Sequence, residues 1–515
     1  MNLIKKIIPI VLVLIAGSLV FLQYKFKSEI TNAIDKKLPQ NIKIDYTQLN
    51  ANVFSGTVAF DSLSAKILND NKNVITSLNA NSLNISGFSV WQFLVNNTIS
   101  INNIIFENPD LLYYSNQQSK ERPKDSTKNE RFDKSIKIDK ISFKNGSFKI
   151  KESKEDSLYF NMDSISFNLI GLSTDAYKLK EKIPFDYRDY NFSCEQIFMN
   201  MNQFEHLKIE KLNVGKGKLK LQNLYIKPKF TPQELSTKIV VERDHIQLHI
   251  PELAFDGLYF GFNNSRFYLL TKSGTLTKPE LIMYRDKRIA DDMTIKKLYS
   301  KMLRELSFKL DISEFKIGQG YISYSERVKN DSKAGKIFFN DVNASIINLS
   351  NTYEDGEKTE ISASSNFMGK APMTLDLSFD VNNNQDEFLA SGQFKNFDVK
   401  MANSFFESNL NAKAEGEIEQ IFFTFNGNNF SSKGDLKMKY RNFKFKVLNK
   451  KNRVNKLLTA IGNIFVKDGS KADKDGFRHG NIEVERNKNK SFFNYLWINV
   501  EDGLISTLTG DGEKN

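Results

Sequence analysis

A short amphipathic pattern recurs along the chain and predicts repeated β-strands. Between Ile136 and Ile150, apolar residues stand at positions 136, 138, 141, 143, 148 and 150, and Gly146 interrupts the run. Residues two apart lie on one face of a strand, whereas the Lys, Asp, Ser and Asn residues between them face water. The pattern therefore predicts a strand unit with one apolar face and one polar face.

The same template fits three further stretches of the chain. The apolar positions are filled by Ile99, Ile101, Ile104, Phe106, Leu111 and Tyr113, by Leu207, Ile209, Leu212, Val214, Leu219 and Leu221, and by Leu310, Ile312, Phe315, Ile317, Ile322 and Tyr324. Pro109, Gly217 and Gly320 take the place of Gly146. A degenerate fifth copy runs from Leu248 to Phe262, with its glycine displaced to position 257. Agreement at every apolar position indicates an internal repeat.

The centre of each copy has two interpretations. The odd spacing from Phe143 to Phe148 places the two side chains on opposite faces of a straight strand. Asn145-Gly146 suits a two-residue primed turn, which folds the chain back on itself. The alternative is a β-bulge, which lets the strand continue. Either arrangement keeps the apolar side chains of the copy on one face.

Strand-like alternation also fills most of the chain outside the copies. It runs from about Ile42 to Ala80, resumes beyond residue 360, and follows the second and fourth copies at Leu158–Leu169 and Ile337–Leu349. The last two stretches have the same spacing, so the repeat is longer than its template.

Four short helices are expected among the strands. Ser89 is a suitable N-cap for one apolar turn that ends near Asn96. Apolar residues at three- and four-residue steps predict helices over Asp291–Leu306, Val454–Phe465 and Ser491–Leu508. The Asp291–Leu306 helix can plug one end of the sheet or serve as a plain crossover, which is the simpler interpretation.

The last helix has an unusual density of aromatic residues near its start. Its expected apolar stripe consists of Phe493, Trp497, Val500, Leu504 and Leu508. Aromatic residues at this density are typical of a membrane interface. A helix that caps the edge of a sheet is the commoner arrangement, and we favour it.

The N-terminus carries an uncharged apolar run between flanking lysines. The run spans residues 7–22 and includes Ile7, Ile10, Leu12, Leu14, Val20 and Leu22. It is short for a membrane span of about 20 residues, and a cleaved signal peptide is the alternative. Because the run continues beyond the small residues 16–18, we expect a retained anchor over residues 1–27. Lysines on both sides leave its orientation open.

Composition excludes several classes of protein. The single cysteine, Cys194, allows no intramolecular disulfide, and we expect it to be buried. The net charge of +12 comes largely from lysines at alternate strand positions, such as Lys137 and Lys149. Such lysines mark the solvated face of a sheet, so nucleic acid is not an expected partner.

No catalytic constellation is evident. His245 and His249 alternate with apolar residues in a predicted strand, so both are expected to face solvent rather than to bind a metal. The chain contains no phosphate-binding glycine loop and no nucleophile elbow. We therefore expect neither an enzyme nor a cofactor or metal. An enzyme would require a polar pocket that converges on one of these two histidines.

Three features, in their order along the chain, carry a resemblance to a known family. They are Gly87-Phe88 with Trp91 after the first strands, the repeated module with Asn145-Gly146-Ser147-Phe148, and a C-terminal region with Gly434–Phe443 and Ser491–Trp497. Together they resemble the AsmA-like family of Gram-negative envelope proteins, within the repeating β-groove group of lipid-transfer proteins. Each motif alone has low specificity, and the family has no active residue to carry over.

The resemblance implies a mainly β fold. An N-terminal transmembrane helix would be followed by a long, curved, mostly antiparallel β-sheet groove with a few short capping helices. It also implies an inner-membrane anchor with the bulk of the chain in the periplasm, and phospholipid or another acyl-chain lipid as the ligand. The expected domains are the anchor (1–27), the groove body (28–430) and a C-terminal β/helical region (431–515). Other envelope proteins are possible partners.

The number of helices bears on how the apolar face is used. An apolar sheet face must be covered by another layer, and four short helices cannot cover so many strands. Either the sheet closes on itself, or the face is left for a ligand with hydrocarbon tails. In the second case the groove residues come from the repeat: Ile104, Phe106, Ile141, Phe143, Phe148, Leu212, Val214, Phe315, Ile317 and Ile322. The alternative function is a structural or assembly factor for outer-membrane biogenesis that binds partners through sheet edges.

Overall fold

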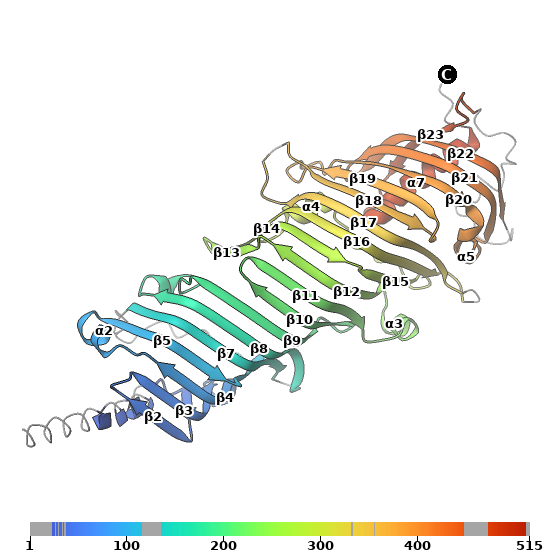
Figure 1. Cartoon of the computed structure of the whole chain (residues 1–515). Helices are drawn as coiled ribbons and strands as arrows, with labels where there is room; N and C mark the ends of the chain where they lie inside the picture. Colours follow the sequence, from blue (N-terminus) through green and yellow to red (C-terminus); the bar gives the residue numbers. More distant parts are fainter. Residues whose placement is uncertain are drawn as a thin grey trace, which may run out of the picture. The chain divides into compact units, whose positions relative to one another are not determined.

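The protein is mainly β, as the alternating pattern predicts. The computed structural model describes residues 23–25, 27–28, 30–32, 34–35, 38–115, 135–153, 155–330, 333–354, 356–447 and 472–510. Strands account for 61% of the structure, and its helices are few and short (Figure 1). The chain divides into two compact units, with residues 1–201 and 207–221 in unit 1 and residues 202–206 and 222–515 in unit 2. Each unit is treated separately below.

The predicted membrane anchor and the predicted helix Val454–Phe465 fall outside the described residues. This applies to the anchor positions Ile7, Ile10, Leu12, Leu14, Val20 and Leu22. Among the helices in the described part of the chain, none combines the length and the apolar character needed to cross a membrane.

Unit 1 is a sheet whose strands are mostly antiparallel to their neighbours. Its elements are β1 (Ile42–Asp45), β2 (Gln48–Asn52), β3 (Thr57–Leu68), β4 (Val74–Ser86), α2 (Val90–Val95), β5 (Thr98–Glu107), β6 (Asp110–Ser115), β7 (Ser135–Glu152), β8 (Ser157–Thr174), the 3-10 turn η2 (Lys178–Lys180), β9 (Asp189–Asn200) and most of β10 (Glu205–Gly215). The short helix α2 begins as predicted, because the Ser89 side chain accepts a hydrogen bond from the Gln92 N–H. Strands β5 and β6 are exceptional, since both run parallel to β7.

The parallel pairing brings two copies of the repeat side by side. Ile104 lies opposite Ile141, Phe106 opposite Phe143, and Leu111 opposite Phe148. Every template position of the first copy therefore contacts the same position of the second. This confirms that the repeat is structural.

In the second copy the β-bulge is correct and the primed turn is wrong. Strand β7 continues through Asn145-Gly146, with register shifts on both sides of Gly146. A primed turn of this type requires positive φ at both residues, and here only Asn145 has it, at 52°. A Cβ on Gly146 would lie 3.0 Å from the Pro109 Cγ of the neighbouring copy. A side chain at this position would therefore crowd Pro109, so the neighbouring copy favours glycine here.

The same bulge occurs in unit 2 around the fourth copy. The Tyr321 N–H donates to the Pro279 carbonyl at 2.8 Å, as the Ser147 N–H donates to the Pro109 carbonyl at 2.7 Å. The strands that carry Pro279 therefore form a further copy, which the template misses because Thr271 and Gly274 occupy two of its apolar positions.

The third copy differs from the others. Lys216 and Gly217 both have positive φ, 50° and 68°, and strand β11 (Lys218–Pro228) begins directly after them. This is the backbone geometry of the primed turn. The two interpretations of the sequence are therefore both realised, in different copies.

Unit 2 contains the remaining strands and most of the helices. After β11 these are α3 (Pro232–Lys238), β12 (His245–Asp256), β13 (Tyr259–Asn263), β14 (Arg266–Thr277), β15 (Glu280–Asp286), α4 (Tyr299–Arg304), β16 (Lys309–Arg327), β17 (Gly335–Ser350), β18 (Thr359–Phe367), β19 (Ala371–Phe379), β20 (Phe388–Asp398), η3 (Val399–Ala402), α5 (Asn403–Phe405), η4 (Phe406–Leu410), β21 (Ala412–Gly427), β22 (Ser431–Val447), β23 (Arg478–Glu485) and α7 (Phe492–Thr509). Strands β14 and β15 run parallel to β16, and from β16 to β23 each strand is antiparallel to the next.

The helix predicted over Asp291–Leu306 is much shorter than expected. Only Tyr299–Arg304 is helical, and residues 291–298 have no regular secondary structure. The Asp292 carboxylate accepts hydrogen bonds from the Thr294 N–H and hydroxyl, both at 2.9 Å. This local turn competes with helix formation. The spacing of apolar residues gives no sign of such side-chain hydrogen bonds, so it overestimated the length of the helix.

The last helix is present, but its buried face differs from the predicted stripe. Ser491 caps α7 through the Asn494 N–H, and Gly510 ends it with a φ of 86°. The buried positions are Phe492, Tyr495, Asn499, Gly503, Thr507 and Leu508. Of the predicted stripe, Phe493 is 70% exposed and Trp497 is 51% exposed.

Cys194 is buried in β9, as predicted, and should react slowly with thiol reagents. It is 0% exposed, and its Sγ lies 3.8 Å from the Met162 Sδ. Burial raises the pKa of the thiol from 9.0 to about 11, so the reactive thiolate is on the order of 100-fold scarcer than in an exposed thiol. We expect maleimide labelling at neutral pH to be slow in the native chain and fast in urea. Rapid labelling of the native chain would contradict this.

Candidate functional site

Apolar side chains of successive strands form rows that cross the sheet of unit 1. The aromatic row consists of Phe60, Leu83, Phe106, Phe143, Phe167 and Phe192, each directly opposite the next. The phenylalanine rings contact one another from strand to strand, with centroid distances of 4.9 Å for Phe106–Phe143 and 5.9 Å for Phe143–Phe167. Edge-to-face ring pairs of this kind are favourable beyond their buried area.

A second row lies beside the aromatic row on the same face. It consists of Val58, Ile85, Ile104, Ile141, Leu169 and Tyr190. Residues two apart in a strand share a face, so the two rows form one continuous apolar band. Beyond the bulge, Leu78, Leu111, Phe148 and Met162 are opposite one another in the same order of strands.

The band of unit 1 is covered at only one end by described residues. Phe60 is 6% exposed and packs in a small core with Leu49 and Leu63, against which Ile30 and Ile34 lie. From Phe106 to Phe192 the phenylalanines of the aromatic row are only half-buried. Most of the band therefore retains apolar surface in contact with solvent.

Unit 2 has an equivalent pair of rows. One consists of Phe255, Gly274, Phe315, Ile346, Ile361, Leu377, Ala390, Phe425, Gly434 and Ile482, and the other runs beside it from Leu253 through Leu276, Ile317, Ala344, Ala363, Leu375, Gly392, Phe423 and Leu436 to Gly480. Exposure changes along the first row. Phe315 and Ile346 are half-buried, whereas Leu377, Phe425 and Ile482 are 5%, 1% and 2% exposed.

The change in exposure has a clear cause. Segment 291–305, which includes α4, and helix α7 lie over the buried end of the row, and we call these two segments the cover. Leu298 of the cover is 2% exposed. The Phe388 ring contacts those of Phe492 and Tyr495 at centroid distances of 5.0 and 5.7 Å. The rows of unit 2 are thus open from β12 to β17 and closed by the cover towards β23.

Helix α7 also caps the outer edge of β23. The Asn481 N–H donates to the Ser506 hydroxyl at 2.9 Å, and the Glu483 N–H donates to the Asp502 carboxylate at 2.8 Å. Unpaired N–H groups at a sheet edge are otherwise available to another strand. The predicted edge-capping role of this helix is therefore confirmed.

A buried ionic cluster holds the two segments of the cover together. The Glu242 carboxylate, 4% exposed, forms ion pairs with Lys287 at 2.7 Å, Lys490 at 3.1 Å and Arg285 at 3.8 Å. Asp291 pairs with the same two lysines, at 3.1 and 2.9 Å. Lys490 and Lys287 hold the pKa of Asp291 below its usual value. The cluster joins the start of the α4 segment to the residue before α7.

The structure places eight of the ten predicted groove residues on the apolar rows or beside them, and the other two, Leu212 and Val214, on strand β10, which pairs with β9. Ile104, Phe106, Ile141, Phe143 and Phe148 lie together in unit 1, and Phe315, Ile317 and Ile322 lie on β16. All ten are half-buried. Sequence reasoning missed Leu83, Phe192 and Ile361, because their strands lie outside the template and only alternation marks them.

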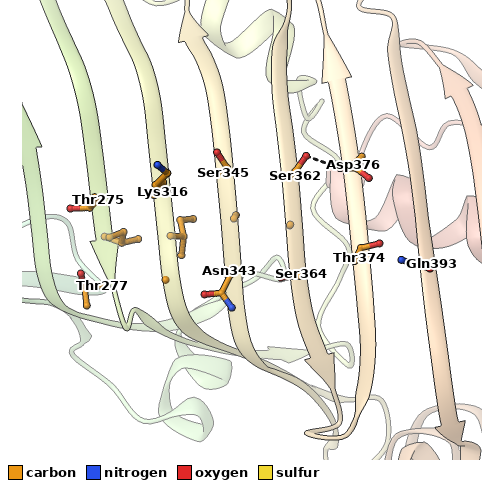
Figure 2. Close-up of a pocket in the computed structure, with 15 residues that line it drawn as sticks. Thr275, Thr277, Lys316, Asn343, Ser345, Ser362, Ser364, Thr374, Asp376 and Gln393 are labelled. Atoms are coloured by element: carbon orange, nitrogen blue, oxygen red, sulfur yellow. Dashed lines mark hydrogen bonds between the residues drawn. The ribbon is translucent and has the colours of Figure 1, made fainter.

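The opposite face of the unit 2 sheet has a hollow of about 740 Å³. The residues that line it belong to β14 and to β16–β20. Figure 2 shows their side chains, among them Thr275, Lys316, Ser345, Ser362 and Asp376. Residues 275 and 316 adjoin Leu276 and Ile317 of the apolar row, so their side chains face the other way. The Ser362 hydroxyl donates to Asp376 at 2.6 Å. Hydroxyl and amide side chains line the hollow together with apolar surface that includes Leu276 and Ile317.

The prediction that both histidines face solvent is wrong for His245. Its side chain is 3% exposed, and its Nε2 lies 2.9 Å from the Phe230 carbonyl oxygen, because the chain after β11 passes over this end of β12. His249 is half-buried and stacks on Tyr225 with a centroid distance of 4.4 Å. Within the described ranges, no group of three or more His, Cys, Asp or Glu residues is placed to hold a metal ion.

Comparison of the chain with protein-family models, with curated proteins and with solved structures returns no match.

Proposed function

We propose that this protein holds the acyl chains of lipids on the apolar rows of its sheets and carries phospholipid between the inner and outer membranes of a cell envelope. The observation that carries the proposal is the half-buried aromatic row from Phe106 to Phe192. A row of this kind runs across the strands, so a hydrocarbon chain can follow it from one strand to the next. In this proposal the sheet is the curved groove of the AsmA-like family, which the sequence resembles.

The energetics favour a ligand with long hydrocarbon tails. Each methylene removed from water contributes about 0.8 kcal/mol, and the phenylalanines beneath it lose exposed area at the same time. A small polar ligand would gain little on such a surface. The polar groups of the sheet lie on its opposite face, so the headgroup would remain in water beside the row.

The proposed location follows from the resemblance and the N-terminal apolar run. Residues 1–27 would anchor the chain in the inner membrane, and the remainder would lie in the periplasm. A chain with one cysteine forms no intramolecular disulfide, so its stability does not depend on an oxidising environment. An oxidising compartment such as the periplasm is equally compatible with it.

Replacing Phe143 or Ile317 by aspartate should remove most of the lipid that copurifies with the chain. A carboxylate in the middle of either row imposes the cost of burying an unpaired charge beneath an acyl chain. We expect the bound phospholipid, quantified by mass spectrometry after extraction, to fall about tenfold, which corresponds to 1.4 kcal/mol. Lys137→Asp and Lys309→Asp are matched controls, because they place the same charge on exposed positions of the same strands.

A photoreactive residue at Phe143 separates this proposal from an assembly factor. Crosslinking to phospholipid supports lipid transport, whereas crosslinking only to envelope proteins supports the assembly role. Recovery of no lipid in either experiment, with Phe143→Asp and Ile317→Asp fully functional, would refute the proposal. The capped edge of β23 already argues against partner binding by strand addition at that position.

A further inference from the structure

The cover carries a cluster of large apolar side chains on its outer surface. Met293, Ile295 and Phe493 are 70%, 71% and 70% exposed, and Met302 and Trp497 are 52% and 51% exposed. We call these five residues the outer patch. They come from the two segments of the cover.

Several contacts place these segments side by side. The Tyr299 ring contacts that of Phe493 at 6.5 Å, and the Lys296 N–H donates to the Lys488 carbonyl at 2.8 Å. The Asn489 amide lies 3.7 Å from the Met293 Sδ. Phe493 and Trp497 are one turn apart on α7 and therefore share a face. Met293 and Phe493 therefore lie where the two segments meet, and Ile295 and Met302 are close in sequence to these contacts.

The division of aromatic residues on α7 shows that this exposure is not a by-product of packing. Phe492 and Tyr495 face the sheet and are 6% and 1% exposed, which already satisfies the need to close the row. Phe493 contacts only the rim of that core through Tyr299, and Phe493 and Trp497 remain largely in solvent. Adjacent exposed apolar side chains of this size are characteristic of a binding surface.

The charge around the outer patch indicates what it binds. The exposed lysines beside the outer patch are Lys296, Lys297 and Lys301, whose side chains are 38%, 51% and 40% exposed, and Lys488 precedes α7. Asp292 and Glu305 pair with the first three, so positive charge is in excess there. The Lys488 ammonium lies 3.9 Å from the centroid of the Phe430 ring, which is 59% exposed beside it. Lysines at the rim of an apolar surface complement the anionic headgroups of a bilayer, and aromatic side chains occupy the boundary between headgroups and acyl chains.

We propose that the outer patch docks unit 2 on the surface of an anionic lipid bilayer, with Phe493, Trp497 and Ile295 inserted at the headgroup–acyl boundary. A bilayer fits better than a protein partner that adds a strand to the sheet, because the adjacent β23 edge is occupied by α7. The proposal does not require the rows to hold lipid. Vesicle binding and lipid extraction are separate measurements, so either proposal can fail without the other.

The two tryptophans of the chain allow a local test. In the full-length Trp91→Phe variant, Trp497 is the only tryptophan and reports on the outer patch alone. We expect vesicles of phosphatidylcholine and phosphatidylglycerol to shift its emission to the blue, and lipids with a quencher on the acyl chain to quench it. The shift should weaken in high salt, as screening of the lysines predicts. The Trp497→Phe variant keeps Trp91, which is 70% exposed on α2 of unit 1, as the reference reporter.

Substitutions in the outer patch complete the test. In the Trp91→Phe background, Ile295→Ser with Phe493→Ser should reduce the vesicle-induced response of Trp497 at least tenfold. Tyr177→Ser, at a position that is 83% exposed in unit 1, should leave it unchanged. An absent response of Trp497, a response unaffected by the double substitution, or a shift that depends on protein concentration without vesicles would each overturn the proposal. The last result would identify a second copy of the chain as the occupant.

Discussion

Replacing Gly480 by valine should release α7 from the sheet and lower the free energy of unfolding of unit 2 by about 3 kcal/mol. A Cβ at this position would lie 2.4 Å from the Gly503 carbonyl oxygen and 2.5 Å from the Thr507 Oγ1. Both atoms belong to α7, whose own Gly503 approaches Leu436 and Ile482 closely. The helix cannot move away without exposing Phe492 and Tyr495. We expect a lower urea midpoint when unfolding is followed by Trp497 fluorescence in the Trp91→Phe background.

Gly318→Val is the matched control for this substitution. It makes the same change in another strand of unit 2, where a Cβ would meet nothing within 4 Å. Its effect on the urea midpoint should be small. Equal midpoints for the two variants would show that the contact between β23 and α7 is not the close approach described here.

Replacing Glu242 by glutamine should destabilise unit 2 by about 3–5 kcal/mol. The carboxylate is 4% exposed and is the common partner of Lys287, Lys490 and Arg285. Glutamine keeps the volume but removes the charge, so three cations lose their shared buried counter-ion. Removal of the anion alone costs free energy of folding because the cations that remain are still largely shielded from water. The expected result is a lower thermal midpoint and earlier proteolysis between residues 286 and 299.

The control for this prediction is Glu305→Gln. Glu305 forms ion pairs with Lys297 and Lys301 on the surface of the same segment, and its side chain is 41% exposed. Exposed pairs of this kind contribute about 0–1 kcal/mol. If both variants unfolded at the same temperature, the cluster around Glu242 would not be what secures the cover.

The sequence was most informative where the chemistry is local and repeated. Alternation predicted the strands, and the template predicted which positions of Ile99–Tyr113 and Ile136–Ile150 share a face. The template could not distinguish a turn from a bulge at Asn145-Gly146. The equivalent pair Lys216-Gly217, which also ends in glycine, forms the turn. The deciding factor is the neighbouring strand, where Pro109 occupies the space that a side chain on Gly146 would need.

Errors occurred where distant residues determine the outcome. Periodicity assigned Phe493 and Trp497 to the buried stripe of α7, whereas the close approach at Gly503 turns the helix so that Phe492 and Tyr495 face the sheet. The burial of His245 depends on the Phe230 carbonyl, fifteen residues away. The rows themselves were only partly predictable, because each includes residues such as Phe192 from strands that do not match the template.

The parallel pairing of β5 and β6 with β7 has a consequence for how such a sheet changes length. Equivalent residues of the two copies are 37 positions apart and lie directly opposite each other. Tandem duplication of that 37-residue segment would therefore add a strand whose side chains fall into the existing rows, one per row. In unit 2 the equivalent offset, from Leu276 to Ile317, is 41 residues, so the connection between copies can differ in length while the side chains remain in the rows. The number of strands can therefore change by duplication or deletion of a whole copy, which lengthens or shortens the apolar rows without substitutions elsewhere in the sheet.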